Sequence, residues 1–263
     1  MRGTRIQGWI IVVSLTAFLI SCDEGPNQST WTDRQAANPF CSALSSSGTT
    51  AWMSASITDN DLFFFTKQDR TDTMVVSYTD YRDASALFVS NGRQVNPGSV
   101  RFNGFSLSSG SSNYFTRYND LTFDMDGKTY EWQIAGSSDF PAISDSLTAP
   151  AAKVRITSHA VLSRVSRIRD LGITWSPAGS QDHAVLVVVQ GRDEIGPTIP
   201  YFMDTFPDNG SCTIPASTFS GFRDQKMNIS VSRGRYAIRT SPDGRQYIMT
   251  MYSQHNVDVR LGE

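Results

Sequence analysis

Lysine, histidine and cysteine are scarce in this sequence of 263 residues. It contains 4 lysines, 3 histidines and 3 cysteines, and its formal net charge is −2. So weak a charge gives no electrostatic reason to expect a nucleic-acid partner. Serine and threonine are abundant instead, with 34 and 23 copies, beside 29 aromatic residues. Aromatic and β-branched side chains suit pleated strands, so the composition predicts an all-β protein with hydroxyl-rich outer faces.

Hydrophobic runs long enough to span a membrane are also lacking. The apolar, uncharged stretch Ile6–Ser21 follows Arg2 and Arg5 and has 16 residues. A spanning helix needs roughly 20, whereas a basic start followed by a shorter apolar region is typical of a secretory signal. We therefore expect residues 1–21 to be removed. The remaining chain would carry 21 basic and 25 acidic residues, a net charge of −4.

Motifs that carry catalysis or metal binding are missing as well. The sequence has no His-Glu-x-x-His, no paired Cys-x-x-Cys, no Gly-x-Ser-x-Gly and no phosphate-binding glycine loop. His159, His183 and His255 stand in separate segments, and we interpret the last two as solvated turn residues. We expect no catalytic residue, no metal site and no cofactor.

Acidic residues offer two weaker alternatives. Asp120, Asp124 and Asp126, and also Asp59-Asn60-Asp61, have the composition of calcium-binding loops, but capping of tight turns is the favoured interpretation. A glycoside hydrolase would need two carboxylates that flank the scissile bond, for which Asp124, Asp126 and Glu131 lie close enough in sequence. Asp126 belongs to an Asp-Gly turn, and strand carboxylates usually face solvent, which favours the non-catalytic interpretation.

The end of the leader, Leu19-Ile20-Ser21-Cys22, resembles the lipobox of bacterial lipoproteins. The resemblance implies cleavage before Cys22 and a diacylglycerol on its sulfur, often with a further acyl chain such as palmitate on the freed amino group. Attachment would then rest on the acyl chains, of which a stable anchor needs at least two. Asp23 resembles an inner-membrane retention signal, while other bacteria use nearby acidic residues for surface export. We expect a cell-envelope protein; the outer membrane or cell surface is favoured, with the periplasmic face of the inner membrane as the alternative.

Residues 22–50 are rich in Ser, Thr, Asn, Gln, Gly and Pro and include Ser45-Ser46-Ser47-Gly48-Thr49-Thr50. We expect a flexible tether there. The alternative is that Trp31, Phe40 and Cys41 dock onto the first domain as an initial strand.

Beyond the tether, short apolar runs separated by turn residues recur about every ten residues, as in β-sandwiches. The predicted strands are Trp52–Ile57, Leu62–Thr66, Met74–Tyr81, Ala86–Ser90, Val100–Leu107, Tyr114–Tyr118, Leu121–Met125, Thr129–Ile134, Val154–Thr157, Val161–Ser166, Gly172–Trp175, Ala184–Gln190, Tyr201–Asp204, Ser211–Ile214, Met227–Val231, Tyr236–Thr240, Tyr247–Tyr252 and Asn256–Leu261. Asp126-Gly127 and Asp243-Gly244 predict hairpins. Ala184–Gln190 reads as a strand buried on both faces, and Ala216–Phe222 as a short helix.

The stretch Gly136–Ala152 interrupts this rhythm, so we place a domain boundary there and expect two tandem β-sandwich domains, 51–149 and 150–263. The second loosely resembles an immunoglobulin domain, because Trp175 lies on an early strand before a corner at Cys212. The flanking cysteine pair of antibody domains is missing. Cys41 and Cys212 form an even pair once Cys22 carries lipid; a disulfide and two separate thiols remain alternatives.

Aromatic and basic side chains are the remaining route to function. Tyr114, Phe115 and Tyr118, or Tyr201 and Phe202, would form a sugar- or protein-binding platform if exposed, and core positions if not. Arg164, Arg167 and Arg169 are candidates for contact with an acidic partner, although strand alternation places Arg164 on the opposite face from the other two. We therefore expect a membrane-anchored, non-catalytic protein for binding, adhesion or envelope assembly, with a protein or glycan ligand. The alternative is an exported hydrolase or a carbohydrate-binding accessory module acting on polysaccharide or peptide.

Overall fold

The computed structural model describes residues 49–66, 72–90, 93–109, 114–179, 184–191, 200–222 and 226–262. The predicted signal peptide, Cys22 and Cys41 lie outside the described residues, as does the predicted tether apart from its last two residues. Within them the protein is all-β, as predicted, and the 3-10 turn η2 (Ala216–Phe219) stands where a short helix was predicted.

The strands, in chain order, are β1 (Thr49–Phe65), β2 (Thr73–Ser90), β3 (Arg93–Gln94), β4 (Val100–Phe102), β5 (Phe105–Ser106), β6 (Ser108–Ser109), β7 (Tyr114–Tyr118), β8 (Thr129–Ile134), β9 (Ile143–Thr148), β10 (Arg155–Ile156), β11 (Arg164–Ser166), β12 (Leu171–Ser176), β13 (Ala184–Gly191), β14 (Tyr201–Pro207), β15 (Ser211–Ile214), β16 (Lys226–Thr240) and β17 (Gln246–Gly262). They form one large sheet in the order β14-β13-β16-β17-β1-β2-β7-β6, with β11 also pairing with β17 and β3 with β2. Two smaller sheets have the orders β5-β4-β8-β9 and β10-β12-β15.

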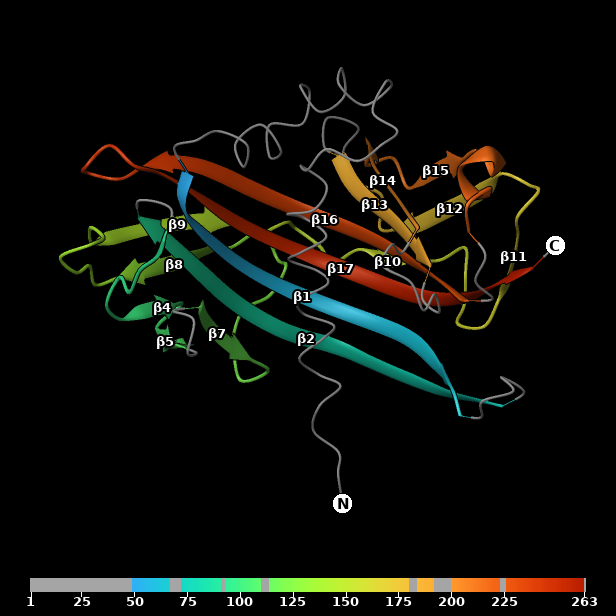
Figure 1. Cartoon of the computed structure of the whole chain (residues 1–263), viewed down its shortest axis with the longest axis horizontal. Coiled ribbons are helices and arrows are strands. Elements are labelled where there is room, and N and C mark those ends of the chain that lie inside the picture. Colours follow the sequence, from blue (N-terminus) through green and yellow to red (C-terminus); the bar gives the residue numbers. More distant parts are fainter. Residues whose placement is uncertain are drawn as a thin grey trace.

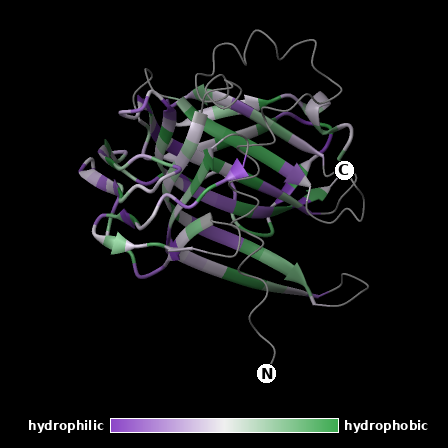
Figure 2. Ribbon diagram, turned by 60° about the vertical axis from the view of Figure 1, so that its left-hand side comes forward, coloured by the Kyte–Doolittle hydropathy of each residue, from purple (hydrophilic) through white to green (hydrophobic). Residues whose placement is uncertain are grey.

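Four long strands, β16, β17, β1 and β2, run side by side across the whole molecule (Figure 1). At 17 residues β1 is about 55 Å long, well beyond an ordinary strand of 3–10 residues. Each long strand merges two runs that the sequence pattern separated; Trp52–Ile57 and Leu62–Thr66, for example, both belong to β1. The polar residues between such runs were interpreted as turns, but they lie on strands. Hydrophobic and hydrophilic segments consequently follow one another along these ribbons (Figure 2).

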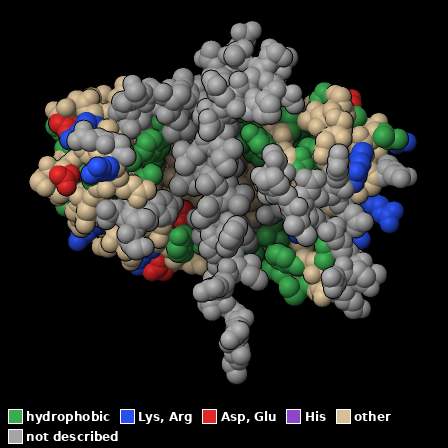
Figure 3. Space-filling model, in the orientation of Figure 1, with side chains coloured by type: hydrophobic (Ala, Val, Ile, Leu, Met, Phe, Trp, Pro, Cys, Tyr) green, Lys and Arg blue, Asp and Glu red, His purple; other side chains and the backbone are tan. Residues whose placement is uncertain are grey.

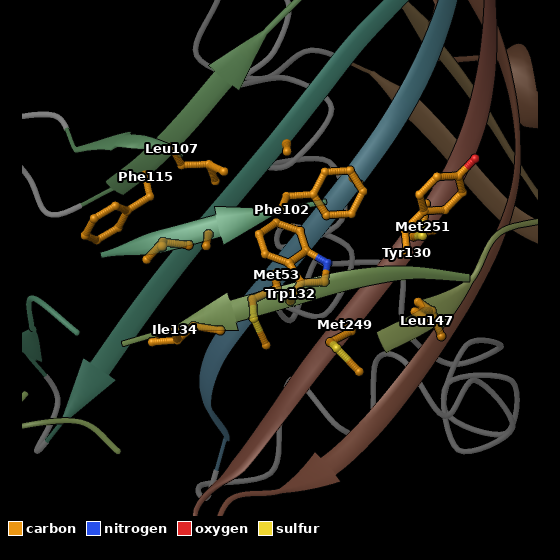
Figure 4. Packing of buried hydrophobic residues seen from close by; sticks show 14 of the residues in the cluster. Met53, Phe102, Leu107, Phe115, Tyr130, Trp132, Ile134, Leu147, Met249 and Met251 are labelled. Atoms are coloured by element: carbon orange, nitrogen blue, oxygen red, sulfur yellow. The ribbon is translucent and has the colours of Figure 1, made fainter. Parts of the chain in front are cut away.

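The first hydrophobic core lies between one half of the long strands and the four-stranded sheet. Met53 of β1 and Met249 of β17 face Phe102 of β4 and Trp132 of β8, which is fully buried (Figure 4). The Phe102 and Trp132 rings lie 4.8 Å apart between centroids. Alternation explains the choice of face, because Ala51, Met53, Ala55 and Ile57 point to one side of β1 and Trp52, Ser54 and Ser56 to the other.

The second core lies between β13, β16 and β17 of the large sheet and the three-stranded sheet. Val257 and Val259 of β17 pack there with Ile229 of β16 and Ile173 of β12. Trp175 donates from Nε1 to Oδ1 of Asp208 at 2.8 Å. Arg233 of β16 pairs with the same carboxylate through Nε at 2.6 Å, which joins the small sheet to the large one through a buried ion pair.

The two predicted units share the large sheet. β1 pairs in parallel with β17 from Thr49↔Gln246 to Asp61↔Val257, so residues 51–149 and 150–263 both supply long strands to it. The all-β class is confirmed, but the tandem two-domain arrangement is not, because β16 and β17 of the second segment add Ala237, Met249 and Met251 to the first core. The predicted boundary Gly136–Ala152 also contains β9, which pairs with β8 and adds Ile143 and Leu147 to the first core.

One of the two predicted hairpins is correct. Asp243-Gly244 lies in the turn between β16 and β17, where Thr240 pairs with Gln246 and Gly244 has φ +86°. The hairpin at Asp126-Gly127 is wrong, because Leu121–Met125 forms no strand; Arg82 and Asn103 side chains donate instead to the carbonyls of Phe123 and Thr122. In Ala184–Gln190 one face is fully buried and the other only partly.

A polar junction separates the two cores on the same face of the large sheet. His255 of β17 lies there, buried, between Met251 and Val257, so the interpretation of this residue as a solvated turn residue is wrong. The backbone N–H of Ile156 donates to Nδ1 of His255 at 3.0 Å. The neutral ring therefore carries its proton on Nε2, which lies 3.3 Å from Oδ2 of Asp61. This hydrogen bond joins the segment between the two small sheets to the centre of the large sheet.

Shared strands predict that both cores unfold together. Replacing Trp132 by Ala should lower the free energy of unfolding by roughly 3–5 kcal/mol, because it leaves a cavity in the first core. Amide hydrogen exchange should then accelerate equally at Val187 and Val231, which lie in the second core. Unchanged protection of these amides, or two separate urea transitions, would contradict a single cooperative unit.

The His255 junction predicts lower stability in acid. Burial lowers the pKa of His255 from 6.5, opposed by the charges of Asp61 and Asp59 and reinforced by Arg155. As the pH falls below about 6.5, the unfolded chain binds a proton at this histidine more readily than the folded chain does, so the free energy of unfolding should decrease. The measurement is urea unfolding at pH 7.5 and 5.5. His255→Gln should remove this part of the pH slope, and an unchanged slope would refute the assignment.

Candidate functional site

The large sheet has a second face, opposite both cores, that is rich in polar side chains. Alternation places Ser54 and Ser56 of β1, Asp83 and Ser85 of β2 and Thr250 of β17 on this face. Ser54 pairs with Ser85 on one side and with Thr250 on the other, and the Thr250 hydroxyl donates to Ser54 Oγ at 2.9 Å. Both small sheets use the opposite face, so within the described ranges no second sheet packs here. We call this surface, around Asp83, the Asp83 face.

Asp83 is the unusual residue of this face. Its cross-strand neighbours are Ser56 on β1 and Tyr118 on β7. The side chain is buried, and among the described residues its Oδ1 has no hydrogen-bond partner. Burial raises the pKa of Asp83 from 3.8 to about 7, an effect that the hydrogen bond from Ser85 partly opposes. A buried acceptor without a partner is costly, and such groups are rare in stable proteins.

Aromatic side chains surround this carboxyl. Tyr81, two residues before Asp83 on β2, lies with its ring centroid 6.2 Å from that of Tyr118, at an interplanar angle of 31°. Tyr118 is 39% exposed, so the group opens to solvent at this point. Burial raises the pKa values of both phenols, and the charge of Asp83 adds to the shift. Trp52 of β1 lies on the same face, and its indole Nε1 has no hydrogen-bond partner within the described part of the chain.

The other half of the same face is closed by its own hydrogen bonds. Asn256 donates to Asn60 at 2.9 Å, and Asn228 donates to Asp258 at 2.8 Å. Lys226 forms a buried ion pair with Asp258 at 2.8 Å. These polar groups satisfy one another, as buried polar groups in structural networks do. The contrast leaves the half that carries Asp83 and Trp52 as the candidate functional site.

The acidic residues singled out in the sequence are engaged elsewhere. Arg117 pairs with Asp120 at 2.5 Å, and Lys128 pairs with Asp126 at 2.5 Å. Glu131 accepts from the Ser144 hydroxyl at 2.8 Å, while Asp124 accepts from its neighbour's backbone N–H. Asp59 and Asp61 lie in the junction between the cores. Among the described residues no group of three or more His, Cys, Asp or Glu is arranged to hold a metal ion.

The aromatic candidates divide between core and surface. Phe115 is a core residue, whereas Tyr118 belongs to the Asp83 face. Tyr201 is 46% exposed on β14, and Phe202 packs partly against the second core. Tyr114 lies on β7, where it pairs in register with Leu87 of β2.

The arginine string lies at one end of the molecule. Arg164 is on β11, and Arg167 and Arg169 follow it around the 79% exposed Ile168. Basic side chains gather at the end where β11 is drawn (Figures 1 and 3). Val165, between two of these positions, is buried in the second core, which fixes the strand.

Of the remaining sequence candidates, His159 lies beside Ser158, whose Oγ is 2.6 Å from its Nδ1, and His183 lies outside the described residues. Cys212 is buried on β15, and burial raises its thiol pKa to about 12. Cys41 lies outside the described residues, so the pairing with Cys212 stays a prediction. No helix in the described ranges is long and apolar enough to cross a membrane.

Comparisons with known proteins give little for this chain. No protein-family model matches it, and no curated protein matches it. One match among solved structures is the crystal structure of DIP-gamma IG1+IG2, at 8% identity, covering 78% of this chain and 94% of that chain with a TM-score of 0.18. A TM-score this low does not establish a common fold, so the match carries no argument about topology.

Sequence reasoning missed Asp83, Tyr81 and Trp52. Tyr81-x-Asp83-x-Ser85 is an alternating run that was divided between a strand end and a turn, because Asp is depleted in strands. Reading the run as one strand would have placed its three side chains on one face. Whether that face meets a core depends on strands distant in sequence.

The buried carboxyl of Asp83 should lower the stability of the protein at high pH, so replacing it by a neutral side chain should stabilise the protein there. The folded chain keeps this carboxyl protonated up to about pH 7, while the unfolded chain ionises near 3.8, so stability is lost as the pH rises through this range. Asp83→Asn should therefore stabilise the protein at pH 8 by on the order of 3 kcal/mol and much less at pH 4. Urea unfolding at both pH values measures this. Asp120→Asn, at an exposed position, is the control; an equal effect of Asp83→Asn at both pH values would contradict the assignment.

Proposed function

We propose that this protein is a lipid-anchored binding protein of the bacterial cell envelope, without catalytic activity. The anchor is supported by Leu19-Ile20-Ser21-Cys22 at the end of a leader that resembles a lipoprotein signal. β1 begins at Thr49, which leaves residues 23–48 between the lipidated Cys22 and the folded part. A segment of this length and composition holds a folded unit tens of Å from a bilayer when extended.

The observation that carries the binding role is the Asp83 face. It occupies one half of a sheet face whose other half is closed by internal hydrogen bonds, and it retains a buried acceptor and a donor without partners among the described residues. Stable folds do not keep such groups unpaired without cause, and a ligand supplies the missing partners. The acidic residues considered for hydrolysis are engaged in pairs and turns, which supports a non-catalytic role.

The proposal also includes a division of the chain into two structural units. Residues 150–263 form an immunoglobulin-like unit built around Trp175, and residues 51–149 form the unit that carries the Asp83 face. The buried Trp175 side chain, packed between β12 and the large sheet, supports this. The outer membrane or cell surface is the favoured location, with the periplasmic face of the inner membrane as the alternative.

Replacing Cys22 by Ala should abolish incorporation of a labelled fatty acid and move the protein from the membrane to the soluble fraction, because no thioether can form. Labelling with an alkyne-tagged palmitate and fractionation of cells measure both effects. Cys41→Ala is the matched control and should keep label and location. Continued labelling of the Cys22→Ala variant would refute the anchor.

A further inference from the structure

We propose that the Asp83 face binds a neutral, hydroxyl-rich glycan chain, held between Asp83 and Trp52 and stacked on the Tyr81–Tyr118 pair. This inference rests on the proposed binding function and adds the chemical class of the ligand. It starts from two groups that lack partners among the described residues, the Oδ1 of Asp83 and the Nε1 of Trp52.

The two groups have opposite hydrogen-bonding roles. An indole N–H is a donor only, whereas Oδ1 of Asp83 is an acceptor that lacks a donor among the described residues. A ligand group that only donates, such as an ammonium, would leave the indole without an acceptor, and a group that only accepts, such as a carboxylate, would leave Oδ1 of Asp83 without a donor. A ligand that satisfies both must donate and accept, which every sugar hydroxyl does.

Spacing favours a chain over a single small molecule. Asp83 lies opposite Ser56, four residues along β1 from Trp52, which corresponds to about 13 Å. This separation exceeds the length of one hexose ring. A ligand that reaches both groups therefore contains at least two sugar units.

The tyrosines supply the stacking surface and the entrance. Tyr118 is 39% exposed and lies directly opposite Asp83 in the register, so a sugar that stacks on this ring reaches the carboxyl behind it. The two rings are 6.2 Å apart between centroids and tilted by 31°, which forms a broad apolar surface for the C–H face of a pyranose.

The test uses the full chain purified in detergent and affinity electrophoresis through gels that contain a β-1,3-glucan, an α-1,4-glucan, a xylan or a mannan. We expect at least one of the four to retard the protein. Asp83→Leu and Trp52→Phe should each weaken that interaction at least about tenfold, because each leaves a sugar hydroxyl facing an apolar group. Tyr118→Ala should weaken it similarly. Tyr201→Ala removes a tyrosine that is 46% exposed on the distant β14 and should change nothing.

Thermal unfolding checks the variants. Trp52→Phe changes only the indole N–H and ring size, so it serves even if Asp83→Leu fails to fold. No retardation by any of the four polysaccharides, or retardation that neither variant changes, overturns the proposal, as does a ligand found to be a polypeptide. Such a failure would leave Cys22-dependent membrane attachment intact, so it is distinguishable from failure of the proposed function.

Discussion

The parallel pairing of β1 with β17 is the constraint on which the rest of the structure depends. It places the first described strand beside the last one and joins two antiparallel hairpins, β1-β2 and β16-β17, into one continuous sheet. The first core then forms on a surface to which both halves of the chain contribute strands, while the second core lies on β13, β16 and β17 of the same sheet. Strand side chains alternate, so both cores lie on one face of this sheet. That face is apolar at its two ends, where the cores are, and polar in the middle.

In the middle of this face, side chains of β17 hydrogen-bond to the segment that connects the two small sheets. The N–H groups of Val154 and Ile156 donate to Ser253 and His255, at 2.9 and 3.0 Å, where the chain crosses between the small sheets. Side-chain acceptors on β17 thus satisfy backbone donors that have no strand partner there. A buried donor without a partner costs more than a hydrogen bond contributes, so these two residues fix where the crossing lies.

On the opposite face, similar polar residues are paired in one half and partly unpaired in the other. Around Asn60, Asn228 and Asp258 the polar groups pair among themselves, and Lys226 neutralises the buried charge. Around Asp83 no cation and no donor reaches Oδ1 among the described residues. Paired networks stabilise a fold, whereas unpaired buried groups lower its stability. The difference between the two halves is the physical basis for proposing a ligand at one and not at the other.

The sequence by itself determined the all-β class, most strand positions and the Asp243-Gly244 hairpin, because alternation and turn chemistry are local properties; the lipoprotein-like leader stays a prediction from a short motif. The tertiary structure decided that Asp59, Asp83 and His255 lie on strands rather than in turns. Local preference favours turns for such residues, and long-range pairing of β1 with β17 and β2 overrides it. It also decided which polar groups find partners, since those partners come from strands up to 196 residues away in sequence. The Asp83 face follows from that pairing and from no single segment.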